Sequence, residues 1–140
     1  MSIYDPVRQK FVEATPEEHV RQKLILWLHE DKKVPLHLME VESSLSNYRK
    51  NAPGRVDVLV HGTRQGRGVA QPWILAECKT RDNSSWEELQ VQISRYLKHL
   101  QPEFLILDLD TQRKLYQVSK QGRELLLKAI KDIPEFMESL

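Results

Sequence analysis

The chain contains one cysteine, Cys78, which excludes an internal disulfide framework. A lone cysteine fits a reducing compartment, so we expect a cytoplasmic protein. No apolar run approaches the roughly 20 residues of a membrane-spanning helix, and the first residues lack the basic and apolar regions of a signal peptide. Neither sign of charge dominates, because the net charge is only +1. Any contact with nucleic acid must therefore come from local basic clusters or from a partner subunit.

The motifs of several common enzyme classes are also missing. The five histidines are scattered and show neither HExxH nor another zinc-binding spacing. The sequence has no GxSxG nucleophile motif and no GxxxxGK[ST] phosphate loop. Zinc hydrolase, serine hydrolase and ATP-driven motor chemistry therefore find no support in the sequence.

The sequence contains enough apolar residues for one folded domain, since 40% of its 140 residues are hydrophobic. The apolar spacing predicts the element order α-β-β-β-α-β-β-α, an α/β domain with a central mixed sheet flanked by helices. We expect a helix from Thr15 to before Pro35, one from Ser85 to before Pro102, and a last one over Leu125–Ile130. The expected strands cover residues 36–45, 55–60, 73–80, 104–109 and 115–118, with a hairpin loop at 61–68.

Charged residues interrupt two of the predicted strands. Asp57 lies within the apolar run 55–60, and Glu77 and Lys79 lie within or at the end of the run 73–80. Burying a charge is costly unless the group is paired, hydrogen-bonded or bound to a metal. Because side chains alternate along a strand, Glu77 and Lys79 should share one face.

Two carboxylates and one ammonium on adjacent strands predict a divalent-metal site for a phosphodiester. Asp57 and Glu77 are candidate ligands for Mg²⁺ or Mn²⁺, and the backbone carbonyl of Cys78 is a candidate third oxygen ligand. Lys79 would hold the attacking water or stabilise charge in the transition state. The simpler alternative is a structural ion pair between neighbouring strands.

The pattern Asp57…Glu77-Cys78-Lys79 resembles the D…ExK signature of the PD-(D/E)xK nuclease superfamily. Segments around it resemble one branch, the N-terminal nuclease domain of the type I restriction enzyme R subunit and its small free-standing relatives. These segments are 15–22, 41–42, 55–57 and 92–96, and the resemblance extends over roughly 4–109. It implies a restriction-endonuclease-like core, metal-dependent DNA cleavage, and DNA and other restriction or helicase subunits as partners.

The resemblance assigns metal binding to Asp57 and Glu77 and catalysis to Lys79. It also matches Glu18 to an acidic residue that many superfamily members place on the first helix, facing the site. Glu18 has a simpler role available, because it completes a capping box with Thr15.

Further positions match residues that contact DNA. Gln92 and Tyr96 match a QxxxY motif that lies near the active site and the DNA backbone in related nucleases, although an amphipathic tyrosine beside an apolar stripe also suits simple packing. Arg55 and the loop residues Arg64 and Arg67 are candidate phosphate contacts. Loop arginines are more often simply solvated.

Two non-catalytic functions stay open on the sequence alone. One is a DNA-binding or assembly module that retains the nuclease fold with weak or no catalysis, and the other is a structural interaction domain. The oligomeric state is equally open. Double-strand cleavage with one site per chain favours a homodimer or two sequential nicks.

Overall fold

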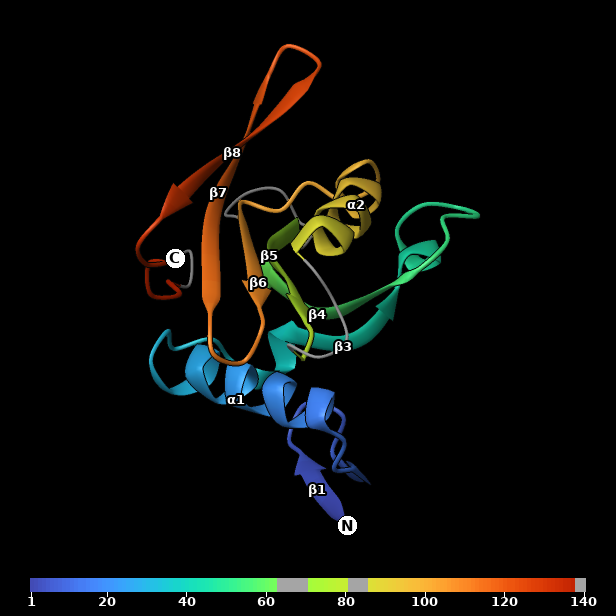
Figure 1. The fold of residues 1–140 in the computed structure, drawn as a ribbon, viewed down its shortest axis with the longest axis vertical. Coiled ribbons are helices and arrows are strands. Elements are labelled where there is room, and N and C mark those ends of the chain that lie inside the picture. The colour runs from blue at the N-terminus through green and yellow to red at the C-terminus, as the bar shows by residue number, and fades with distance from the viewer. Residues whose placement is uncertain (63–70, 81–85, 138–140) are drawn as a thin grey trace.

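The computed structural model describes residues 1–62, 71–80 and 86–137. It has an α/β architecture with a six-stranded mixed sheet in the order β3-β4-β5-β6-β7-β8 (Figure 1). Strands β5 and β6 pair in parallel, and the other neighbouring pairs of this sheet are antiparallel. The predicted fold class and mixed sheet are thus confirmed. The strands are β3 (Met39–Ser44), β4 (Arg55–Gly62), β5 (Gln71–Cys78), β6 (Phe104–Asp108), β7 (Arg113–Gln121) and β8 (Glu124–Ile130).

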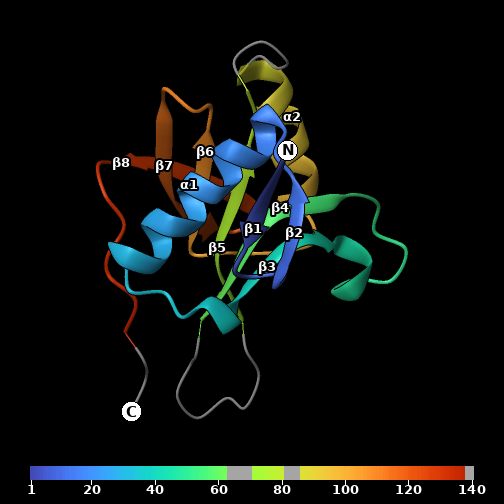
Figure 2. The same ribbon diagram turned by 90° about the horizontal axis from the view of Figure 1, so that it is seen from below.

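Helices α1 (Pro16–Glu30) and α2 (Trp86–Leu97) cover different faces of this sheet (Figure 2). Because side chains alternate along a strand, the continuous apolar runs of β4, β5 and β6 supply a core on each face. The α1 side buries Val20, Leu24 and Leu28 of the helix against Val58, Val60, Ile74 and Ala76 of the sheet. The α2 side buries Ile93, Tyr96 and Leu97 against Leu59, Leu75, Leu105 and Leu107.

The first helix begins with half of the predicted capping box, because the Thr15 amide donates to the Glu13 carbonyl at 2.9 Å and the Glu18 carboxylate binds Arg8, Arg21 and Gln22 instead. Thr15 is the N-cap, and its hydroxyl oxygen accepts a hydrogen bond of 3.1 Å from the backbone amide of Glu18. Pro16 takes the first helical position, where a missing amide hydrogen costs nothing. Of the second predicted capping box, Ser85 lies outside the described residues, and α2 is described from Trp86 onward.

The predicted final helix over Leu125–Ile130 is wrong, because residues 124–130 form strand β8. This strand pairs along its length with β7, from Leu115↔Ile130 to Gln121↔Glu124. Gly122, with φ +63°, allows the tight turn between the two strands. As a strand, this segment gains backbone hydrogen bonds with the edge of β7. A short helix at this position would leave that edge unpaired. Alternation along β8 also lets Leu125 and Ile130 reach the two different cores.

The structure contains a small N-terminal hairpin that the sequence patterns did not indicate. Strands β1 (Ser2–Asp5) and β2 (Lys10–Glu13) form a separate two-stranded sheet near the start of α1. The predicted strand 36–45 is also shorter, because short 3₁₀ turns, η1 (Leu36–Leu38) and η2 (Leu45–Asn47), lie on either side of β3.

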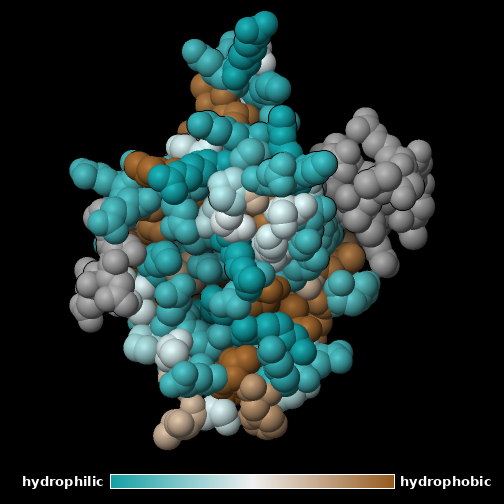
Figure 3. Space-filling view, turned by 90° about the vertical axis from the view of Figure 1, so that its right-hand side faces the viewer, coloured by the Kyte–Doolittle hydropathy of each residue, from teal (hydrophilic) through white to brown (hydrophobic). Residues whose placement is uncertain are grey.

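The visible surface is predominantly polar. On the side shown in Figure 3, hydrophilic side chains cover most of the face, and hydrophobic ones form small separate patches. Within the described part of the chain, no helix has the length and apolar character needed to cross a membrane.

Candidate active site

The candidate site lies at a gap in the sheet around Asp57. The pairing of β4 with β3 skips Asp57, and the pairing of β4 with β5 ends at Val58. Across the gap on β3, Glu42 has a φ of +53°, a left-handed conformation that is unfavourable for a side chain of this kind. Strained backbone of this sort is concentrated at functional sites in proteins. The gap leaves the polar groups of Asp57 free to interact with side chains and with the end of β5.

Asp57 and Glu77 come together at this gap, as the sequence predicts. The backbone amide of Cys78 donates to Asp57 Oδ2 at 2.8 Å, and the amide of Asp57 donates to Glu77 Oε1 at 3.2 Å. The Glu77 side chain is fully buried. Burial, and then the negative charge of Asp57, raise the pKa of Glu77 well above its ordinary value. Two carboxylates in such an environment attract a compensating cation.

The side chains at the gap suit a hard divalent cation. Glu77 Oε2 is buried and accepts no hydrogen bond from any described residue, which is a costly state for a carboxylate oxygen without a partner. In residues 1–62, 71–80 and 86–137, no three His, Cys, Asp or Glu side chains are grouped to hold a metal. Mg²⁺ needs only one or two carboxylates when waters or backbone oxygens complete its shell. The donor set therefore fits Mg²⁺ or Mn²⁺ better than a metal that requires a full cage of side chains.

Lys79 follows directly after β5 at the same end of the sheet. Its backbone amide donates to the carbonyl of Asp108 on β6 at 2.9 Å, which fixes the position of the residue. The ammonium is 3.8 Å from Glu17 Oε1, and the Lys79 side chain is about one quarter exposed, at 25%. The positive charge of Lys79 lowers the pKa of Glu77, but by less than burial and the charge of Asp57 raise it. Lys79 is thus partly accessible to solvent, and within the described residues its ammonium pairs with Glu17 of α1.

The Cys78 thiol belongs to the core on the α1 side and is buried. Burial and the surrounding carboxylates raise its pKa well above the ordinary value, which keeps the thiol protonated and unreactive. This placement agrees with a packing role for the side chain. The backbone of Cys78 contributes the amide that holds Asp57.

Glu18 of α1 interacts with arginines and contacts Asp57 only through one of them. Glu18 Oε1 accepts from Arg8 at 2.6 Å and from Arg21 at 3.0 Å, and Oε2 accepts from Gln22 at 3.1 Å. The same Arg21 guanidinium lies 3.5 Å from Asp57 Oδ1. Arg21 therefore connects the first helix to the candidate metal ligand.

The sequence reasoning assigned no role to Arg21, to Glu17 or to Arg8. The one available signal was the three-residue spacing of Glu18 and Arg21, which places both side chains on one face of a helix. The spacing alone does not show that the pair faces Asp57. That placement depends on how α1 packs across β4 and β5.

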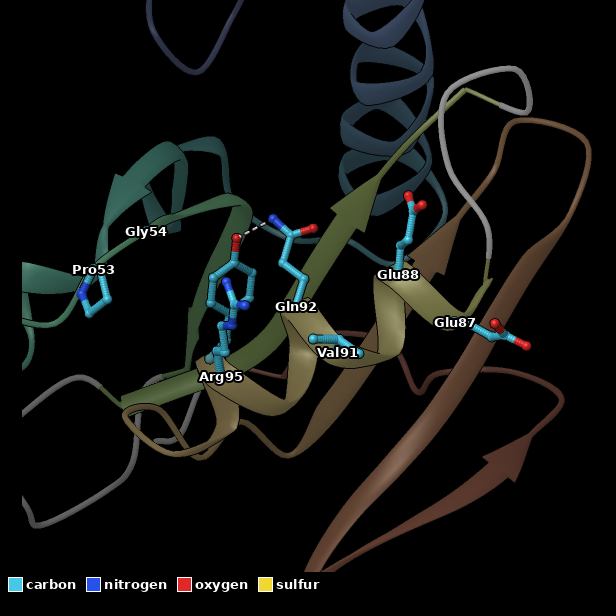
Figure 4. Close-up of a pocket in the computed structure, with 8 residues that line it drawn as sticks. Pro53, Gly54, Glu87, Glu88, Val91, Gln92 and Arg95 are labelled. Atoms are coloured by element: carbon cyan, nitrogen blue, oxygen red, sulfur yellow. Dashed lines mark hydrogen bonds between the residues drawn. The ribbon is translucent and has the colours of Figure 1, made fainter.

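Gln92 and Tyr96 meet on α2, as their spacing predicts. The Gln92 amide donates to the Tyr96 hydroxyl at 2.6 Å (Figure 4). This hydroxyl donates to the backbone carbonyl of Arg55 at 2.7 Å. Tyr96 is buried, and burial together with the charge of Glu77 raises its pKa. Tyr96 therefore ties α2 to the backbone two residues before Asp57.

A cavity of about 630 Å³ opens beside this pair. In Figure 4 the Gln92 and Arg95 side chains extend from α2 on the side that faces Pro53 and Gly54. Arg55, at the start of β4, has an exposed side chain. The predicted phosphate contacts Arg64 and Arg67 lie outside the described residues.

Comparison with known proteins supplies the family. The chain matches the family described as "Type I restriction enzyme R protein N terminus (HSDR_N)" over residues 16–134. No match was found among curated proteins or among solved structures. The matched range includes α1, the gap at Asp57, Lys79 and α2. The chain therefore belongs to the family of type I restriction enzyme R protein N-terminal domains.

Proposed function

We propose that this domain is a metal-dependent DNA endonuclease, with Mg²⁺ or Mn²⁺ held by Asp57, Glu77 and the backbone carbonyl of Cys78. Membership of a restriction-enzyme family supports a nuclease-like module that acts on DNA. The observation that carries the metal-dependent part is the pairing of Asp57 with a buried Glu77 whose second oxygen accepts no hydrogen bond in the described part of the chain. A cation bound there supplies positive charge for the developing phosphorane and lowers the pKa of a bound water.

The side chains around the carboxylates have distinct roles in this proposal. Hydrolysis joins a water oxygen to phosphorus and breaks one P–O ester bond, and the departing oxygen gains a proton. Lys79, partly exposed just after the end of β5, positions the water or stabilises the added negative charge. Glu18 acts through Arg21, because Arg21 is its link to Asp57.

The DNA would approach along the cavity beside α2. Gln92 and Tyr96 are proposed to orient the scissile strand, with Gln92 the more accessible of the two. Arg55, Arg64 and Arg67 are proposed phosphate contacts. Because the net charge is only +1, we expect weak, salt-dependent DNA binding by the domain alone, and other restriction or helicase subunits or a second copy of the chain as partners.

One observation favours a second candidate, a catalytically inactive DNA-binding or assembly module. The guanidinium of Arg21 already lies beside Asp57 and Glu18 and supplies positive charge at the site. In an inactive module this contact would be permanent and would replace the metal. Metal binding by the wild-type protein distinguishes the two candidates.

Cleavage of supercoiled plasmid with Mg²⁺ or Mn²⁺ tests the proposed function. We expect nicking that disappears in EDTA and falls at least about a hundredfold in Asp57→Asn and Lys79→Ala, which is the range for loss of a catalytic group. Lys98→Ala, which removes an exposed lysine at the end of α2, is the matched control and should cut as the wild type does. Thermal unfolding of each variant establishes that the fold is intact. Equal cleavage by all four proteins would exclude the proposed site.

A further inference from the structure

A buried guanidinium lies where the candidate site needs positive charge. Arg21 is buried on α1 and faces three carboxylates. Its Nη1 is 3.0 Å from Glu18 Oε1, and its Nη2 is 3.5 Å from both Asp57 Oδ1 and Glu42 Oε1. Only the contact with Glu18 has the length of an ordinary hydrogen bond between nitrogen and oxygen.

The hydrogen-bonding capacity of Arg21 is incompletely used. Its Nε is buried and has no hydrogen-bond partner in the part of the chain that the structure describes. Leaving a donor of a buried charged group unpaired is costly. The hydrogen bond from Arg21 to Asp57 is long, at 3.5 Å, whereas the shorter bond to Glu18, at 3.0 Å, anchors the side chain.

The two oxygens of Asp57 face different partners. Oδ2 accepts the hydrogen bond from the Cys78 amide at 2.8 Å, so this oxygen is held by the backbone. Oδ1 faces the guanidinium of Arg21. A divalent cation that binds Asp57 through its less constrained oxygen must therefore share that oxygen with Arg21 or displace it.

We infer that Arg21 is a positioning residue and an internal counter-ion for the metal site. It neutralises Asp57 while the metal is absent and withdraws from Asp57 Oδ1, still anchored by Glu18, when the metal binds. This inference rests on the proposed function, because it requires a cation at Asp57. Arg21 then lowers metal affinity and stabilises the metal-free fold at the same time.

Calorimetric titration of the full chain with Mn²⁺ alone, joined to thermal unfolding in EDTA, tests this inference. Removing the charge in Arg21→Met should lower the Mn²⁺ dissociation constant by at least about tenfold, since an opposite charge next to a carboxylate shifts its equilibria by roughly ten- to a thousandfold. The same variant should unfold at a lower temperature in EDTA. Arg21→Lys keeps the positive charge but loses the planar guanidinium group. It should also lower the Mn²⁺ dissociation constant, by a smaller factor than Arg21→Met.

Arg113→Met is the matched control for loss of an arginine ion pair at this end of the sheet. Arg113 Nε is 3.0 Å from the buried Asp108, so its removal should destabilise the fold without tightening Mn²⁺ binding. Tighter binding in both Arg21 variants, lost again when Asp57→Asn is added, supports the inference. Equal or weaker binding in them, with binding by the wild type intact, overturns it and leaves the proposed function standing.

The remaining outcomes separate the inference from the proposed function. If Arg21→Met binds Mn²⁺ and the wild type does not, the counter-ion role is supported, and Arg21 blocks the metal site of the wild type. If no protein in the series binds Mn²⁺ in a way that depends on Asp57, both the inference about Arg21 and the proposed metal-dependent function are overturned.

Discussion

The Tyr96 hydroxyl donates a 2.7 Å hydrogen bond to the backbone carbonyl of Arg55. This bond joins α2 to the start of β4, two residues before Asp57. It is a relationship between a motif residue and the main chain, and it gives Tyr96 a role in placing Asp57 besides the proposed one in contacting DNA.

Tyr96→Phe should lower the free energy of unfolding by about 1–2 kcal/mol, because it leaves the Arg55 carbonyl and the Gln92 amide without this partner. Denaturant unfolding measures the loss. Tyr116→Phe is the control, since the Tyr116 hydroxyl makes no hydrogen bond within the described residues, and its loss should be smaller. Equal losses in the two variants would mean that the Tyr96 bond adds little to the fold.

The positive φ of Glu42 gives a second prediction. Glycine tolerates this conformation and a β-branched residue does not, so Glu42→Gly and Glu42→Val should differ in free energy of unfolding by about 2 kcal/mol, with the glycine variant more stable. The ion pairs of Glu42 with Arg8 and Arg21 cancel from this difference, because both variants lack the carboxylate. At Glu124, in strand β8, glycine should instead destabilise. If the glycine variant were more stable than the valine variant at both positions, the preference at Glu42 would not come from its positive φ.

Gly54 and Gly122 both have a positive φ but differ in their surroundings. A Cβ on Gly54 would lie 3.2 Å from the ring of Tyr96, whereas a Cβ on Gly122 would meet nothing within 4 Å. Gly122→Ala should therefore cost about 1 kcal/mol for the backbone conformation alone. Gly54→Ala should cost more, since the Tyr96 ring is held by two hydrogen bonds and cannot easily yield. Denaturant unfolding of the two alanine variants measures these costs. A smaller loss of unfolding free energy in Gly54→Ala than in Gly122→Ala would contradict the prediction.

Acid should weaken the turn of the N-terminal hairpin, where Asp5 accepts hydrogen bonds from Val7 and Arg8. Burial of Asp5 raises its pKa, but hydrogen bonds from the Arg8 side chain and from the Val7 and Arg8 amides outweigh this and lower the pKa below the ordinary 3.8. The folded carboxylate thus holds its proton less tightly than the unfolded one. Its contribution to stability is present above pH 3.8 and is lost as the pH falls through the lowered pKa.

Asp5→Asn gives the measurement for this pH effect. Wild type should be more stable than Asp5→Asn near pH 6, and the difference between their free energies of unfolding should shrink as the pH approaches 3. A difference that stays constant over this range would show that the charge of Asp5 is not responsible.

The sequence predicted the parts of the fold where local signals and tertiary packing agree. The Thr15 cap and the apolar face of α1 mark the first helix, and the long apolar runs mark β4, β5 and β6. The prediction for residues 125–130 was wrong because the spacing of the leucines there also suits a helix. Pairing with β7 across the tight turn at Gly122 determines β8 instead.

The candidate site shows the same division. Charges inside apolar runs were sufficient to predict that Asp57 and Glu77 meet, whereas the Lys79 ammonium pairs with Glu17 of α1. The environment of Glu18 was not predictable, since Arg8 arrives from a hairpin that the sequence patterns did not indicate. The contact of Arg21 with Asp57 likewise depends on the packing of α1 over the sheet.

The two cores on either side of the sheet have a consequence for how the site moves. Leu75 and Ala76 of β5 are fully buried, and β5 is paired on both edges by β4 and β6. Amide hydrogens in such a strand exchange with deuterium mainly when the whole domain opens. The carboxylates of Asp57 and Glu77 lie at the end of this slowly exchanging region, so their spacing should persist up to the temperature at which the domain itself melts.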